Sequence, residues 1–228
     1  MCYYAQFKDE GRHRFRFDTR IYLCACEDHE QDDGKGIRLG AFVGLNPGSA
    51  DVLNPSDLGK WMEFEPDPTL KLVRKCFVEA AAEGARQHAY VQVWNLFYTR
   101  GPKSQTARHL AGAFSELRRC CSEKTVRPKL VWYAWSGNEK FWTERERKER
   151  KNEFRRLGSD ACFYIGNSTG AARAVIGKPG EASFVGHPKR KRGVETAITN
   201  AIRQLLNAAN PCGEQSGRDD RELRVPRA

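Results

Sequence analysis

The stretch 40–51, Gly-Ala-Phe-Val-Gly-Leu-Asn-Pro-Gly-Ser-Ala-Asp, constrains the fold most because an apolar run ends there in a tight turn. Such a run, followed at once by glycine, asparagine and proline, predicts a buried strand leading into a turn. Gly44 and Gly48 allow close approaches that a side chain forbids, and Pro47 fixes its own φ. Asn46 is therefore presented at the carboxyl end of a strand, where open α/β sheets bind ligands. From the pattern alone, an ordinary strand-to-turn corner is an equally good interpretation.

Apolar runs and amphipathic stretches alternate along the rest of the chain. We expect strands at 37–43, 89–94, 128–135 and 161–165, helices at 68–84, 106–121, 139–157 and 195–209, a bent strand or hairpin at 13–26, and irregular or loop structure at 1–12, 52–67 and 166–180. Asp67 suits a helix N-cap, and Pro68 suits the first helical position. Strands that alternate with helices predict an α/β sandwich with a largely parallel sheet. The length suits one domain, residues 1–209, followed by a flexible polar tail at 210–228.

The charge balance is basic, with 39 Lys and Arg against 29 Asp and Glu and a net charge of +10. This charge favours nucleic acid first and an anionic membrane second, with a merely soluble basic protein as the alternative. Clustering of the cations favours nucleic acid, although the charged run 143–153 has the pattern of a solvated helix face. No apolar run approaches the roughly 18 residues that span a bilayer, and no secretory signal is visible, so we expect a cytoplasmic protein with no membrane partner.

The eight cysteines contain no Cys-x-x-Cys pair. Free core thiols are therefore the preferred interpretation, and we expect no metal and no cofactor.

Three polar residues stand at predicted strand ends: Asn46, Asn95 and His187. Each alone is more often a satisfied structural group. Because the carboxyl ends of parallel strands meet at one edge of a sheet, the three together predict a site there.

These residues lie in motifs with a family resemblance. Val43-Gly44-Leu45-Asn46-Pro47-Gly48 resembles the first active-site motif of the mismatch-specific branch of the uracil-DNA glycosylase superfamily, and His187-Pro188 with its basic loop is similar to the late His-Pro motif. The chain also resembles an uncharacterised bacterial domain family in its Leu-Asn-Pro, Asp-Pro-Thr, Asn-Leu-Phe, Ala-Trp and His-Pro motifs, which occur here in that order between about residues 20 and 205.

The resemblance implies a three-layer α/β/α sandwich with a central mostly parallel sheet, and a DNA glycosylase, a hydrolase that flips a base out of DNA and cleaves its N-glycosidic bond. We expect the protein to be a monomer. It implies that Asn46 orients the attacking water, that His187 donates to the departing base, and that Asn95 reads the base. Phe64, Phe97 or Trp61 would stack on the base. The residues implied to contact DNA are Gly48, Ser49, Lys189, Arg190, Lys191 and Arg192.

The length of the 52–67 connection, with its aromatic residues, suggests a pocket for a bulky or modified base, as would suit antiviral defence against phage DNA. Two alternatives remain. One is a non-catalytic nucleic-acid-binding module. The other is an enzyme of free nucleotides or nucleosides that seats a phosphate at residues 44–48. The cationic run 189–192 argues against a small substrate.

Overall fold

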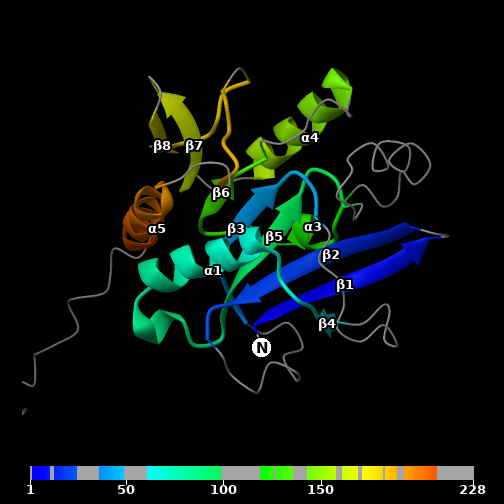
Figure 1. Cartoon of the computed structure of the whole chain (residues 1–228), viewed down its shortest axis with the longest axis horizontal. Helices are drawn as coiled ribbons and strands as arrows, with labels where there is room; N and C mark the ends of the chain where they lie inside the picture. The colour runs from blue at the N-terminus through cyan, green and yellow to red at the C-terminus, as the bar shows by residue number, and fades with distance from the viewer. Residues whose placement is uncertain are drawn as a thin grey trace, which may run out of the picture.

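The computed structural model contains one eight-stranded mixed sheet with helices beside it (Figure 1). It describes residues 2–10, 13–24, 36–48, 61–98, 119–125, 127–135, 143–157, 161–168, 171–181, 183–188 and 193–209. Within these residues the strands are β1 (Tyr3–Glu10), β2 (His13–Tyr22), β3 (Ile37–Gly44), β4 (Trp61–Glu63), β5 (Ala89–Asn95), β6 (Val131–Tyr133), β7 (Cys162–Ser168) and β8 (Ala171–Ile176). The helices are α1 (Pro68–Ala80), the 3-10 helix η3 (Glu83–Ala85), α3 (Ser122–Thr125), α4 (Glu144–Leu157) and α5 (Glu195–Ala209).

The strands lie across the sheet in the order β4-β1-β2-β5-β3-β6-β7-β8. The inner strands β5, β3, β6 and β7 are parallel to one another. The pairs β1–β4, β1–β2, β2–β5 and β7–β8 are antiparallel. Antiparallel pairings therefore outnumber parallel ones among the described strands, and the expectation of a mostly parallel sheet is wrong. The reason is that the hairpins β1–β2 and β7–β8 extend a parallel core of four strands on either side, since antiparallel neighbours need only a short connection.

Local sequence explains the elements around this core. Every residue of β5 is buried, as expected of a strand covered on both faces. The side chain of Asp67 accepts hydrogen bonds from the backbone N–H groups of Thr69 and Leu70, and Pro68 begins α1. This N-cap and proline confirm the predicted start of the helix. Helix α5 has the predicted bounds.

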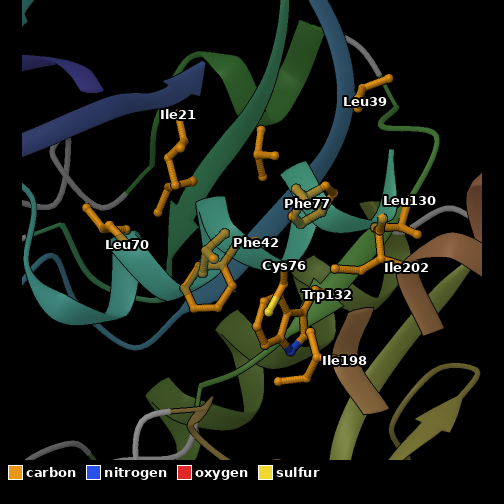
Figure 2. Close-up of a cluster of buried hydrophobic side chains, with 14 of the residues drawn as sticks. Ile21, Leu39, Phe42, Leu70, Cys76, Phe77, Leu130, Trp132, Ile198 and Ile202 are labelled. Atoms are coloured by element: carbon orange, nitrogen blue, oxygen red, sulfur yellow. The ribbon is translucent and has the colours of Figure 1, made fainter. Parts of the chain in front are cut away.

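Helices pack against both faces of the sheet. On one face, α1 and α5 enclose the main hydrophobic core together with Phe42 of β3 and Trp132 of β6 (Figure 2). On the other face, Phe154 of α4 joins Ala41 and Val43 of β3 in a second buried cluster. Alternate residues of β3 therefore face opposite helices, as the two-residue period of a strand requires.

Three segments expected to be irregular form strands instead. They are residues 3–10, 61–63 and 171–176, which form β1, β4 and β8. The predicted helix at 106–121 falls almost wholly, and the predicted tail at 210–228 wholly, outside the described residues. No helix in the described part of the chain is long and apolar enough to cross a membrane.

Candidate active site at the carboxyl edge of the parallel strands

The topology selects one edge of the sheet for ligand binding. The four parallel strands lie side by side in the order β5-β3-β6-β7, whereas the chain forms them in the order β3, β5, β6, β7. The chain therefore leaves β3 toward β5 on one side and leaves β6 toward β7 on the other. Open α/β sheets bind ligands at such a reversal, outside the carboxyl ends of the strands.

The ends of β3 and β5 bring two predicted residues to this edge. Gly44 is the register partner of Asn95. The pairing continues beyond the strands, where the N–H of Leu96 donates to the carbonyl oxygen of Gly44 at 3.0 Å and the N–H of Phe97 donates to that of Leu45 at 3.0 Å. Asn46 follows Leu45 directly, so the two asparagines stand at the ends of adjacent strands.

The side chain of Asn95 is enclosed at this edge. Asn95 is 2 % exposed. Its side chain lies on the same face of β5 as those of Val91 and Val93, which belong to the main core beside α1. A Cβ atom added to Gly44 would lie 3.0 Å from Asn95 Oδ1, so the amide rests against a backbone that only glycine leaves open. Within the described structure, no acceptor receives a hydrogen bond from Asn95 Nδ2.

An unsatisfied buried donor costs about 1–3 kcal/mol. Buried polar groups in native proteins are usually paired, so each exception calls for an explanation. The Nδ2 group of Asn95 is therefore a candidate ligand contact.

The third predicted residue, His187, reaches the edge beside β7. The backbone N–H of Gly186 donates to the carbonyl oxygen of Ile165 at 2.6 Å. The carbonyl of Cys162 accepts from Gly177 on the β8 side, at 2.7 Å. Because carbonyl directions alternate along a strand, the carbonyl of Ile165 points to the β6 side.

The last register pair between β6 and β7 is Tyr133 with Tyr164. Gly186 therefore lies beside β7 where a longer β6 would continue, one residue beyond that pair. A Cβ atom on Gly186 would lie 3.0 Å from the carbonyl oxygen of Ile165, so this approach also requires glycine. His187 follows at the same edge as the two asparagines.

A shared buried cluster ties these segments together. This cluster contains a close neighbour of each predicted site residue: Leu45 beside Asn46, Leu96 beside Asn95, and Val185 two residues before His187. It also contains Trp135, two residues after the end of β6. The segments that carry Asn46, Asn95 and His187 are therefore packed on one another through their neighbours.

The turn after Asn46 lies against the start of α1. Gly48 has a φ of +70°, which strongly favours glycine. A Cβ atom there would also lie 3.0 Å from Oδ2 of Asp67, the N-cap of α1. The positive end of the helix dipole thus adjoins the turn.

A buried ionic network supports the end of β5 from the other side. Arg150 of α4 donates from Nε to the carbonyl oxygen of Leu96 at 3.0 Å and from Nη2 to that of Asn95 at 3.4 Å. Arg150 also pairs with Glu123, and the hydroxyl of Tyr98 donates to the same carboxylate. Burial, the largest cause, together with the charge of Glu123, raises the pKa of Tyr98 well above its ordinary value, so the phenol stays a donor.

The predicted aromatic and DNA-contacting residues have different outcomes. Phe97 is 6 % exposed in the shared cluster. Phe64 is fully buried, with its ring packed edge-on against Tyr3 and Phe7 and under the guanidinium of Arg16. In this conformation Phe64 presents no face on which a base could stack. Ser49, Lys189, Arg190, Lys191 and Arg192 lie outside the described residues.

Sequence reasoning missed Arg150 and Glu123. Arg150 lies in the charged run interpreted as a solvated face, yet only 6 % of the residue is exposed. The available signal was helical spacing, because Arg150 precedes the apolar Phe154 by one turn and shares its buried face. In the part of the chain that the structure describes, no group of three or more His, Cys, Asp or Glu residues is placed to hold a metal ion.

Comparison of the chain with protein-family models, with curated proteins and with solved structures finds no match in any of the three. The motifs and the geometry of this edge are therefore the features that bear on function.

Proposed function

We propose that the protein is a DNA glycosylase that flips a base out of DNA and hydrolyses its N-glycosidic bond. The observation that carries the proposal is the convergence of Asn46, Asn95 and His187 at the carboxyl edge of the parallel strands. These residues occupy the three motif positions that resemble the uracil-DNA glycosylase superfamily. Helices on both faces of a parallel core are also compatible with that superfamily's three-layer arrangement.

The buried amide of Asn95 suits recognition of an extruded base. A flipped base is read through hydrogen bonds to its polar edge. Among the described residues no acceptor pairs with Nδ2 of Asn95, and this donor lies in a residue that is almost fully buried. Phe97, in the same cluster as Leu45 and Leu96, is the proposed stacking residue.

Hydrolysis requires a water and a proton for the leaving base. The carbonyl oxygen of Asn46 would accept a hydrogen bond from the water and aim it at C1′ of the sugar; a neutral amide takes no proton at working pH. Water then forms the new C1′–O bond, and the N-glycosidic electron pair departs with the base. His187 would donate to that base, and the second proton of the water passes to solvent.

The proposed partner is DNA, bound by a cytoplasmic monomer. The net charge of +10 supports binding to the phosphate backbone. Gly48, Ser49 and residues 189–192 are the proposed phosphate contacts. The proposed substrate is a modified base in phage DNA, which would make the protein a defence enzyme.

The test is base release, followed by mass spectrometry, from DNAs carrying uracil, mismatches or modified cytosines, including phage genomic DNA. We expect a free base that disappears with Asn46→Ala. Asn200→Ala is the matched control, because Asn200 lies on the exposed surface of α5, where its side chain contacts Arg203. Tight, salt-sensitive DNA binding without release from any substrate would refute the catalytic proposal in favour of a binding module. Release only from free nucleosides would favour a small-molecule enzyme.

A further inference from the structure

Arg150 grips the backbone at the point where β5 enters the candidate site. Its guanidinium donates to the carbonyl oxygens of two consecutive residues, Leu96 at 3.0 Å and Asn95 at 3.4 Å. The N–H of Leu96 is bonded on the opposite side to Gly44 at 3.0 Å. The peptide that follows Asn95 is therefore held both by β3 and by a side chain from α4.

The guanidinium is itself fixed in place. Glu123, whose side chain is 3 % exposed, accepts from Nη1 at 3.2 Å and from Nη2 at 3.1 Å, and Glu153 accepts from Nη1. The charge also lies 4.7 Å from the centre of the Phe154 ring. Glu123 is held in turn by the hydroxyl of Tyr98 and by a backbone N–H at 3.2 Å.

A buried ion pair is weak evidence for a contribution to stability, because desolvation of the two charges offsets much of their attraction. The distinctive property of this one is geometric. A planar guanidinium with several fixed donors holds oxygen atoms in set directions, which a lysine cannot reproduce. Here two of those oxygens belong to the two peptides that flank the Cα atom of Leu96.

We propose that Arg150 is a positioning residue that sets the place of the Asn95 side chain in the candidate site. This inference rests on the proposed function for its catalytic consequence. Displacement of a reactive arrangement by about 1 Å costs on the order of 100-fold in rate. Loosening this grip should therefore lower the rate of base release, while DNA affinity, supplied mainly by phosphate contacts elsewhere, stays unchanged.

Arg74 provides a matched control. It donates to the carbonyl oxygens of Tyr22 at 3.0 Å and Leu23 at 2.9 Å, which is the same two-carbonyl grip. Tyr22 pairs with Tyr90 near the start of β5, so these hydrogen bonds lie at the opposite end of that strand from the candidate site. Arg150→Lys and Arg74→Lys make the same chemical change at and away from the site.

The experiment compares kcat, Kd for substrate DNA, and Tm for the two variants. We expect Arg150→Lys to lower kcat by about 10- to 100-fold with an unchanged Kd, and Arg74→Lys to leave kcat unchanged at a similar loss of Tm. The double variant Arg150→Met/Glu123→Gln removes both charges together, and it replaces Arg150→Lys if that variant does not fold. Equal kcat values for the Arg150 and Arg74 variants would overturn the inference.

A second readout separates this inference from the proposed function. With selectively ¹⁵N-labelled asparagine, the side-chain amide signal of Asn95, assigned through Asn95→Asp, should shift in Arg150→Lys and not in Arg74→Lys. If the wild-type protein releases no base, the proposed function fails, and the amide signal still decides whether Arg150 positions Asn95. An unshifted signal in Arg150→Lys would refute the positioning role.

Discussion

The contact between Gly44 and Asn95 can be probed by adding one methyl group. The Cβ of Gly44→Ala would lie 3.0 Å from Asn95 Oδ1 and 3.2 Å from Cε1 of Phe42, both tighter than ordinary contacts. Gly44 is not among the described glycines with a positive φ, so space alone opposes the substitution. Phe42 is packed edge-on against Trp132 and cannot yield freely. The amide of Asn95 is therefore the group expected to move.

The magnitude follows from two opposing contributions. Forcing one carbon into a packed interior costs about 1–3 kcal/mol, whereas replacing glycine restricts the unfolded chain and stabilises by about 0.4–1 kcal/mol. We expect a net loss of about 1–2 kcal/mol in the free energy of unfolding. For a chain of this size, that corresponds to a fall in Tm of about 2–8 °C.

Urea and thermal unfolding measure this change, with Gly84→Ala as the control. A Cβ atom on Gly84 has no neighbour within 4 Å, so the control should be neutral or slightly stabilising. Base release by Gly44→Ala should fall because the amide is displaced. The reasoning is refuted if Gly44→Ala matches Gly84→Ala in stability and retains wild-type base release.

Three further predictions concern pH, capping and thiol reactivity. Burial alone would raise the pKa of Glu153, but hydrogen bonds from Arg150 and a second arginine lower it overall, below the ordinary 4.5. The ionised Glu153 carboxylate should therefore stabilise the fold above about pH 4.5, and this contribution should be lost as pH falls through the lowered pKa. The urea midpoints of the wild type and Glu153→Gln should converge at low pH. A difference that stays constant with pH would contradict this. Asp67→Ala should cost about 1 kcal/mol of unfolding free energy and Asp67→Asn much less, so equal losses in urea would exclude capping as the cause. Cys121 is exposed, whereas burial raises the pKa of the Cys76 thiol to about 11, so peptide mapping after brief alkylation should find Cys121 modified and Cys76 intact until the protein unfolds.

The sequence predicted the parallel core better than the strands around it. Continuous apolar runs with glycine or asparagine at their ends identified β3 and β5, and the cap at Asp67 identified α1. These signals depend only on neighbouring residues, so they can be recognised in the sequence without knowledge of the fold. The convergence of strand ends also followed once parallel neighbours were assumed.

The errors arose where distant pairing decides the structure. Residues 171–176 are rich in alanine, a poor strand former, yet they pair along β7 as β8. The alternation of Ala5 and Phe7 with polar neighbours was a weak signal for β1, which forms because β2 and β4 pair with it. Arg150 could not be separated from its charged neighbours because charge says nothing about which helix face a sheet will cover.

The position of β2 in the sheet has a consequence during synthesis. Its outer neighbour β1 is synthesised before it, whereas its inner neighbour β5 is synthesised later and pairs with it through Tyr22 and Tyr90. At 5–20 residues per second, the intervening stretch of about 70 residues takes roughly 3–14 seconds to emerge from the ribosome. Throughout that interval the hairpin presents an unpaired edge, and cations along such an edge discourage pairing with another nascent chain. Arg20, the register partner of Gln92 on β5, places such a cation on this edge.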